Sequence, residues 1–320
     1  MKKCFVGFDT SNYTTSVAVC DEDGRVFANI KIPLPVKEGN RGLRQSDAVF
    51  EHVRNLPKAT ERLRAAIVGY DPVAVGVSVS PRSVEGSYMP CFLSGRSAAY
   101  AFASAIDLPV YEYSHQNGHV MAAMYSSDKS DYLMSLPKFL AFHVSGGTTE
   151  LLLVEPENGK EAFKITLAGQ TADINAGQAI DRVGVSLGLD FPCGKSLEKL
   201  AADYEGKIYR SKITVRDLSC SLSGVENIAA RIYSETQDKN AVAAFVFDFI
   251  ERTLTEMCNQ AMDKYGKLPV LFAGGVMSNK LMRSGLKSRF EAYFSEPEFS
   301  ADNAAGISLL CRHSAKTDNL

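Results

Sequence analysis

The chain has 320 residues, 45% hydrophobic and 22% charged, and 35 basic against 37 acidic side chains give it a net charge of −2. At about 150 residues per domain this length predicts two globular domains, and the near-neutral charge argues against a large nonspecific nucleic-acid surface. The apolar runs are too short to span a membrane, and seven scattered cysteines without a C-x-x-C pair argue against disulfides and a thiolate zinc site, so we expect a cytoplasmic protein without membrane contact.

The first half of the chain alternates strand and helix patterns. Short apolar segments bounded by turn residues predict strands at 3–8, 17–19, 26–32, 73–79 and 108–111. Longer segments between them predict helices at 46–68 and 93–105. The strands are continuously apolar, which is typical of a sheet covered on both faces.

The second half repeats this order about 135 residues later, a spacing too long for a solenoid. Strands are expected at 138–143, 151–154, 162–167 and 268–273, and helices at 176–187, 224–233, 241–265, 280–290 and 302–311. The repeated β-β-β-α-β-α order predicts a duplicated α/β fold of the actin-like ATPase, ribonuclease H-like type. We place the two lobes at 1–128 and 129–320, the second with helical insertions, and expect a ligand cleft between them.

Two glycine-rich turns follow predicted strands in the second half. The first is Ser145-Gly146-Gly147-Thr148, and the second, Ala273 to Asn279, includes Gly274 and Gly275. Such turns let backbone amides approach an anion, and the second also precedes a helix N-terminus. Each is equally compatible with an ordinary tight turn. Asp181 lies on the helix predicted at 176–187, after the first of these turns. Its carboxylate either binds the hydroxyls of a ribose or is a capping or solvated group.

Two of the five histidines, His115 and His119, are four residues apart, and Ser114 before them is a suitable N-cap. On a helix the two imidazoles share one face and could bind one divalent ion. Asp302 could supply a carboxylate, and two histidines with one carboxylate suit iron(II) or zinc. The alternatives are surface histidines and an Asp302 that caps a helix.

Several ordered motifs together resemble one family, the catalytic subunit of tRNA threonylcarbamoyladenosine synthase, formerly described as an O-sialoglycoprotein endopeptidase. The H-x-x-x-H motif is His115–His119 and the late aspartate is Asp302. The other motifs are Ser145-Gly146-Gly147, Ala176-Gly177-Gln178-Ala179-Ile180-Asp181, Ser221-Leu222-Ser223-Gly224 and Ala273 to Asn279. The resemblance implies a metal ion at the first three residues and adenylate contacts at Ser145, Gly146, Gly147, Asp181, Gly194 and Asn279.

The chain also departs from the family pattern. Tyr13 and Thr14 stand where the family has two carboxylates, Thr148 replaces the histidine after S-G-G, and Gln178 replaces a glutamate. Ser80-Pro81-Arg82-Ser83 replaces a G-P-G turn. These changes predict a divergent paralogue.

The resemblance implies an enzyme that transfers a threonylcarbamoyl group from threonylcarbamoyl-AMP to N6 of the adenosine beside a tRNA anticodon. It implies one divalent ion, iron or zinc, and as partners tRNA, a small paralogous dimerisation subunit and an ATPase. The alternative is a non-catalytic or differently specific paralogue that still binds nucleotide and metal, which the loss of the carboxylate pair favours.

Two further readings have less support. A kinase of the same fold needs a catalytic base, for which Asp9 and Asp173 are loose candidates, and a protease lacks the glutamate of H-E-x-x-H. Four basic side chains could contact tRNA phosphates: Arg41, Arg44, Arg54 and Lys58. The alternative is that they are ordinary exposed charges on a helix. The native metal, the acceptor and the oligomeric state are left open.

Overall fold

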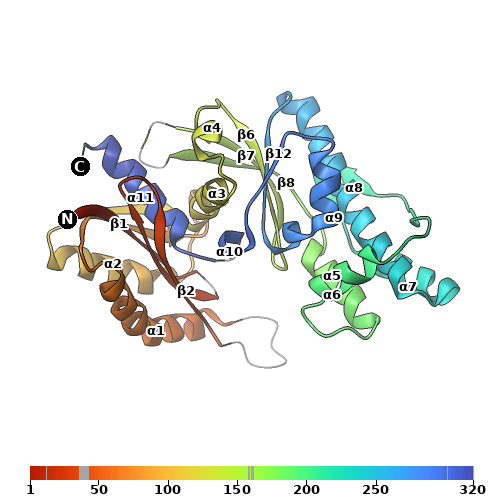
Figure 1. Ribbon diagram of the computed structural model, residues 1–320, viewed down its shortest axis with the longest axis horizontal. Coiled ribbons are helices and arrows are strands. Elements are labelled where there is room, and N and C mark those ends of the chain that lie inside the picture. The colour runs from red at the N-terminus through yellow and green to blue at the C-terminus, as the bar shows by residue number, and fades with distance from the viewer. Residues whose placement is uncertain (12, 36–42, 158, 160–161, 301, 320) are drawn as a thin grey trace. The chain divides into compact units, whose positions relative to one another are not determined.

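The computed structural model describes the whole chain except residues 12, 36–42, 158, 160–161, 301 and 320. Internal contacts divide it into two units (Figure 1). The first unit contains 1–135, 155–165 and 298–320, and the second contains 136–154 and 166–297. The C-terminal segment Glu298–Leu320, which the sequence assigned to the second lobe, thus groups with the first unit.

The first unit is built on a five-stranded mixed sheet in the order β3-β2-β1-β4-β5. β1 pairs antiparallel with β2 and parallel with β4, so β1 lies at the centre. The strands are β1 (Lys2–Asp9), β2 (Thr14–Asp21), β3 (Val26–Pro33), β4 (Tyr70–Ser80) and β5 (Val110–Ser114). The five predicted strands are confirmed, although β5 extends to Ser114 rather than ending at residue 111.

Helices cover both faces of this sheet. The helices are α1 (Gln45–Ala66), α2 (Phe92–Ala105), α3 (His115–Ser126), α4 (Ser130–Met134) and α11 (Ala305–Thr317), with the short α10 (Pro297–Ser300) before α11. Alternate β1 side chains, Val6 and Phe8, pack in a core with Leu63 of α1 and other buried residues. Between them, Gly7 faces α11, and a Cβ there would lie 2.5 Å from the Ser308 nitrogen.

The second unit contains the sheet β12-β11-β6-β7-β8, which repeats the strand order of the first with β6 in the place of β1. Its strands are β6 (Phe139–Val144), β7 (Thr149–Pro156), β8 (Phe163–Gln170), β11 (Val270–Ala273) and β12 (Ala292–Phe294), and a separate ribbon pairs β9 (Thr214–Arg216) with β10 (Ser219–Ser221). The end of β7 and the beginning of β8 fall within the segment Glu155–Ile165, which groups with the first unit. The predicted duplication is therefore confirmed at the level of sheet topology.

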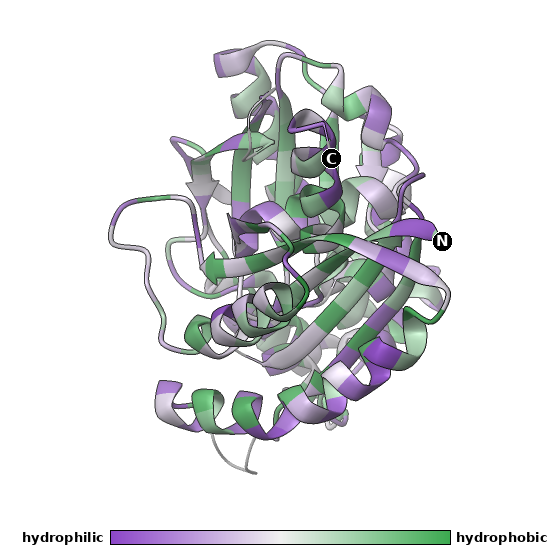
Figure 2. Ribbon diagram, turned by 90° about the vertical axis from the view of Figure 1, so that its left-hand side faces the viewer, coloured by the Kyte–Doolittle hydropathy of each residue, from purple (hydrophilic) through white to green (hydrophobic). Residues whose placement is uncertain are grey.

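The helices of the second unit surround α8 (Lys239–Tyr265), whose side chains are buried around much of its circumference. The others are α5 (Ala176–Ser186), α6 (Gly194–Ala202), α7 (Gly224–Thr236), the 3-10 turn η1 (Gly275–Ser278) and α9 (Lys280–Lys287). Figure 2 shows mostly hydrophobic strands and helices in which hydrophobic and hydrophilic residues alternate. Among the described helices, none is long and apolar enough to cross a membrane.

The last helix differs from its sequence prediction. It was expected to begin at Asp302, but α11 begins at Ala305. The Asn303 side chain accepts a hydrogen bond from the Ala305 amide at 3.0 Å, and Ser16 of β2 accepts one from the Ala304 amide at 2.8 Å. Asp302 therefore lies outside the helix, and its carboxylate does not serve as the helix cap.

Candidate functional site

The two histidines lie at the start of α3, directly after β5. Ser114 ends the strand, and its hydroxyl accepts a hydrogen bond from the Asn117 amide at 3.2 Å. The Pro81 carbonyl accepts another from the Gln116 amide at 3.1 Å. These contacts start the helix at His115, so His115 and His119 are one turn apart on the same face.

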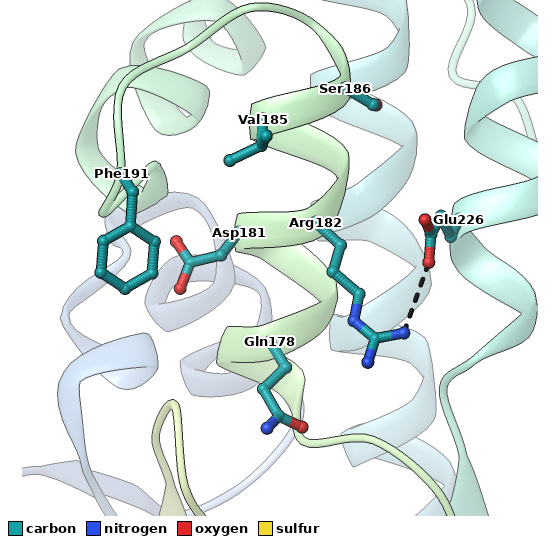
Figure 3. A pocket seen from close by; sticks show the side chains of 7 residues that line it. All are labelled: Gln178, Asp181, Arg182, Val185, Ser186, Phe191 and Glu226. Atoms are coloured by element: carbon teal, nitrogen blue, oxygen red, sulfur yellow. Dashed lines mark ion pairs between the residues drawn. The ribbon is translucent and has the colours of Figure 1, made fainter. Parts of the chain in front are cut away.

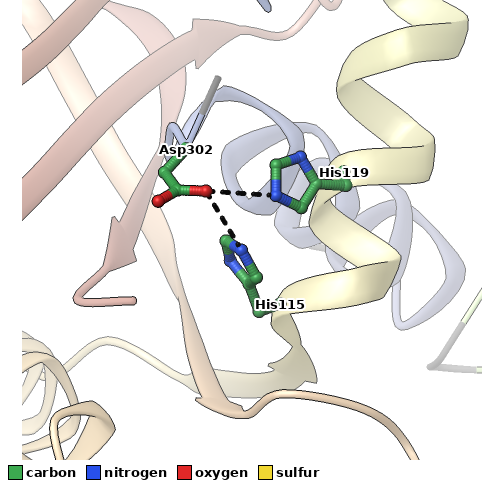
Figure 4. Close-up of side chains that lie close together, drawn as sticks. All are labelled: His115, His119 and Asp302. Carbon is green, nitrogen blue, oxygen red and sulfur yellow. Dashed lines mark ion pairs between the residues drawn. The ribbon is translucent and has the colours of Figure 1, made fainter. Parts of the chain in front are cut away.

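Asp302 points at both imidazoles (Figure 4). Its Oδ1 lies 3.5 Å from Nε2 of His115 and 3.3 Å from Nε2 of His119. All three side chains are partly buried, and each offers one ligand atom within 4.8 Å of the others. The structure thus brings together the three predicted metal ligands from segments almost 190 residues apart in sequence, all of them in the first unit.

These distances suit a single bound ion. Metal–nitrogen and metal–oxygen bonds of about 2.0–2.2 Å place neighbouring ligand atoms about 3.0–3.5 Å apart. The two Nε2–Oδ1 distances, 3.5 and 3.3 Å, agree with that separation. Two imidazoles and one carboxylate also form the donor set that iron(II) and zinc accept while keeping positions open for a substrate.

A fourth residue, Asp9, contacts the opposite side of His115. Its carboxylate lies 3.1 Å from Nδ1 of His115 and also accepts hydrogen bonds from the hydroxyls of Ser11 and Ser78. The side chain is fully buried at the end of β1. From the sequence, Asp9 is only a loose candidate for a kinase base. Its position at the end of a predicted strand could have indicated a functional residue. Only the order of the strands in the sheet reveals that it lies beside His115.

Neighbouring charges and hydrogen bonds shift the pKa values of His115 and Asp302. Burial alone would lower the pKa of His115, but the charge of Asp9 and the hydrogen bonds to Asp302 and Asp9 outweigh it and raise the pKa to about 10. Burial alone would raise the pKa of Asp302, whereas its hydrogen bonds with His115 and His119 hold it well below its usual range. A metal ion that binds here must therefore displace a proton from His115.

Helices α3 and α11 approach each other closely beside these ligands. A Cβ built on Gly306 of α11 would overlap the carbonyl oxygen of Gly118, which lies between the two histidines on α3. A Cβ on Gly118 would meet the end of the Ile307 side chain at 2.8 Å. Gly306 thus permits the backbone contact that keeps the segment after Asp302 against α3.

The first glycine turn in the second unit is internally hydrogen-bonded. The Ser145 hydroxyl accepts hydrogen bonds from the Gly147 and Thr148 amides at 3.2 and 3.1 Å. The turn packs on the start of α5, where the Gly177 amide donates to the Ser145 carbonyl at 3.1 Å. A phosphate that used the Gly147 and Thr148 amides would have to displace the Ser145 hydroxyl from them.

The second glycine turn joins β11 to α9. Gly274 has a φ of +100°, and a Cβ there would overlap the carbonyl oxygen of Val144, so the position requires glycine. Gly275 begins the 3-10 turn. Asn279 caps α9 by accepting from the Met282 amide at 2.9 Å, and its side-chain nitrogen is buried with no hydrogen-bond partner among the described residues. Both N–H donors of this amide group are therefore left for another partner.

Asp181 lines a pocket of about 520 Å³ on α5, a size that fits a small organic ligand (Figure 3). Its carboxylate also accepts a hydrogen bond from the Cys193 amide at 2.8 Å, directly before Gly194 at the start of α6. The pocket is lined by Gln178, Asp181, Arg182, Val185, Ser186, Phe191 and Glu226, and Arg182 pairs with Glu226 at 3.6 Å. Asp181 thus combines a structural contact with exposure to a cavity.

Residues 39–309, most of the chain, match the model of the TsaD family, described as tRNA N6-adenosine threonylcarbamoyltransferase. The chain belongs to the TsaD family. The resemblance seen in the sequence motifs is thereby confirmed, and the family is one of transferases that act in tRNA processing.

Solved structures confirm the actin-like ATPase fold at low sequence identity. Full-length HypF in a phosphate- and nucleotide-bound form is 14% identical with a TM-score of 0.57; the match covers 97% of this chain, which spans about half of HypF (55%). The (R)-2-hydroxyglutaryl-CoA dehydratase component A of Acidaminococcus fermentans is 14% identical with a TM-score of 0.56. The match covers 98% of this chain and 99% of that protein. A ROK family glucokinase from Streptomyces griseus, in complex with glucose and AMPPNP, is 12% identical with a TM-score of 0.51. The match covers 96% of this chain and 98% of the glucokinase.

Asp173, one of the two loose kinase-base candidates, has a structural role in this TsaD-family chain. Its carboxylate accepts hydrogen bonds from the amides of Ile174, Leu222 and Ser223 at 2.7, 2.8 and 3.1 Å, and from the Ser223 hydroxyl at 2.6 Å. It thereby holds the Ser221–Gly224 motif against the loop before α5. Because its oxygens already accept these hydrogen bonds, Asp173 is poorly suited to accept a substrate proton.

We expect Asp173→Asn to destabilise the second unit in a pH-dependent way. Partial burial would raise the pKa of Asp173, but the hydrogen bonds from Leu222, Ser223 and Ile174 outweigh it and lower the pKa below 3.8. The stability that this carboxylate contributes is therefore fully present above pH 3.8 and is lost as the pH falls through the lower folded-state value. Denaturant unfolding at several pH values should show a wild-type advantage at pH 7 that shrinks below pH 4; an advantage independent of pH would contradict this account.

The structure describes the residues that depart from the TsaD pattern, whereas Arg41, one of the basic side chains considered for tRNA, lies outside the described residues. Tyr13 is 42% exposed, and its carbonyl accepts a hydrogen bond from the Leu34 amide. Among the basic side chains proposed for tRNA, Arg54 forms an ion pair with Glu51 at 3.1 Å, which reduces its charge toward phosphate.

Proposed function

We propose that this chain transfers a threonylcarbamoyl group from threonylcarbamoyl-AMP to N6 of an adenosine in tRNA. The observation that carries the proposal is the convergence of His115, His119 and Asp302, with distances that suit one ion, in a chain of the TsaD family. In the reaction, the adenosine amine forms a bond to the threonylcarbamoyl carbonyl carbon and loses a proton. The bond between that carbon and the phosphate oxygen breaks, and AMP leaves.

The three ligands would hold one iron or zinc ion. Such an ion supplies Lewis-acid polarisation of a substrate carbonyl or phosphoryl oxygen. His115 and His119 fix its position from α3, and Asp302 balances part of its charge. By family membership, we further propose that the chain works in the cytoplasm with tRNA, a small paralogous subunit and an ATPase.

The second unit would bind the adenylate. Asp181 faces a pocket large enough for part of a nucleotide, and the unpartnered Asn279 amide nitrogen offers a buried donor. Ser145, Gly146, Gly147 and Thr148 would contact phosphate once the Ser145 hydroxyl is displaced from the turn amides. Gly194, Gly274 and Gly275 would contribute backbone contacts at the starts of α6 and η1.

A second function is favoured by one observation. Tyr13 and Thr14 replace the carboxylate pair of the family. Their presence would suit a paralogue that binds metal and nucleotide without transferring the group to tRNA, or that uses another acceptor.

A single-turnover assay separates the two functions. Purified protein loaded with iron or zinc is mixed with threonylcarbamoyl-AMP and unmodified tRNA, and modified adenosine and AMP are measured together. We expect one AMP for each modified adenosine. His115→Ala/His119→Ala should be slower by about two orders of magnitude or more, because the ion contributes several kcal/mol to such reactions. No product from a protein that still binds metal and adenylate would reject the transferase and support the alternative.

A further inference from the structure

The buried carboxylate of Asp9 is held by side chains of Ser78, Ser11 and His115. It lies at the last residue of β1 with no exposed surface. The Ser78 hydroxyl on neighbouring β4 donates to Oδ1, and the Ser11 hydroxyl donates to Oδ2 at 3.1 Å. Nδ1 of His115 lies 3.1 Å from Oδ2 and 3.2 Å from Oδ1 of the same carboxylate.

The turn after Asp9 is itself held by side-chain contacts with α2. The Thr10 hydroxyl donates to the Cys91 carbonyl at 3.0 Å and accepts from the Gly95 amide at 2.9 Å. A Cβ on Gly95 would lie 2.6 Å from the same hydroxyl oxygen, so the turn and the helix are in close contact. Asp9 therefore has little freedom to leave His115.

The two ring nitrogens of His115 have different neighbours. Nδ1 faces Asp9, whereas Nε2 faces Asp302 at 3.5 Å, on the side where His119 also lies. A neutral imidazole carries one proton, and a carboxylate can only accept it. Asp9 thus keeps the proton on Nδ1 and leaves the Nε2 lone pair directed at the ion position, as carboxylate partners of metal-binding histidines do.

We propose that Asp9 is a positioning residue that fixes the ring orientation and tautomer of His115 and thereby sets the affinity of the metal site. This inference rests on the proposed metal site. Asp9 is not one of the three ligands, but it would hold the ligand His115 in place. A purely structural Asp9 would support the fold without affecting metal affinity in the folded protein. The two roles therefore differ in a measurable quantity other than transferase activity.

The test measures zinc affinity by competition with a chromophoric chelator at pH 7, using the full chain. Loss of a hydrogen-bonding partner behind a metal-binding histidine costs about 10–100-fold in affinity. We expect a loss in this range for Asp9→Ala, a smaller loss for Asp9→Asn and the smallest for Ser78→Ala, which only loosens Asp9. The matched control is Glu112→Gln, which removes a carboxylate of the same unit that pairs with Arg96, and it should bind zinc as the wild type does.

Nitrogen-15 spectra of histidine-labelled, zinc-loaded protein provide a second readout. In the wild type, His115 should carry its proton on Nδ1 and the ion on Nε2, and in Asp9→Ala this pattern should weaken or be lost. Circular dichroism and unfolding temperature report whether each variant folds. If Asp9→Ala does not fold, Asp9→Asn and Ser78→Ala decide the question.

The outcomes separate this inference from the proposed function. Wild-type protein that binds no zinc or iron would reject the metal site and with it the transferase proposal. Wild-type binding that is lost in His115→Ala, together with folded Asp9 variants that bind within about twofold of the wild type, would reject only the role of Asp9.

Discussion

Replacing Asp302 with alanine is expected to abolish stoichiometric metal binding while the chain stays folded. Asp302 is the only carboxylate that the described structure places within reach of both Nε2 atoms of His115 and His119. A structural zinc site with four ligands has an apparent binding free energy of about 10–16 kcal/mol, or about 3 kcal/mol for each ligand. Loss of one ligand should therefore weaken binding by at least about two orders of magnitude.

The measurement is the zinc and iron content after gel filtration, followed by titration against a chelator of known affinity. Asp318→Asn is the matched control, because Asp318 also lies in the C-terminal segment but accepts a hydrogen bond from the Tyr111 hydroxyl at 2.8 Å. The control should retain its metal. An Asp302→Ala protein that binds one ion with wild-type affinity would show that the ion is held elsewhere.

Gly306→Ala is expected to damage both stability and metal binding. The added methyl group would overlap the Gly118 carbonyl oxygen, and neither backbone can yield unless α11 moves away from α3. Inserting a methyl group into such a contact costs about 1–3 kcal/mol. The same movement would carry Asp302 away from the two histidines, so the unfolding temperature and the zinc affinity should fall together.

The neighbouring glycine provides the comparison. In Gly118→Ala the close contacts of the new methyl group are with Cδ1 and Cγ1 of the Ile307 side chain, which can change rotamer, and alanine favours the helix. This variant should unfold within about 1 kcal/mol of the wild type and keep most of its zinc affinity. Calorimetry and chelator competition on both variants test the pair; a Gly118→Ala protein as impaired as Gly306→Ala would mean that the backbone contact is not the decisive one.

Local patterns in the sequence predicted the regular elements and part of the site. Apolar runs with turn residues gave all five strands of the first sheet and four of the second, and their repeated order predicted the duplicated fold. They missed β12 and the short β9–β10 ribbon, whose strands have only three residues each. Ser114 followed by two histidines at helical spacing predicted their common face, because capping and the helical repeat depend only on neighbouring residues. The family motifs added Asp302 as the third ligand.

The partners of these residues were decided by the tertiary structure. Asp9 reaches His115, 106 residues away, because β1 and β5 both pair with β4 and end at the same edge of the sheet. Asp302 comes to the histidines because Asn303 and Ser16 stop α11 short of it and Gly306 allows the helix to contact α3. Such contacts depend on strand order, register and backbone clearance, which involve residues far apart in sequence, so local propensity and spacing could not reveal them.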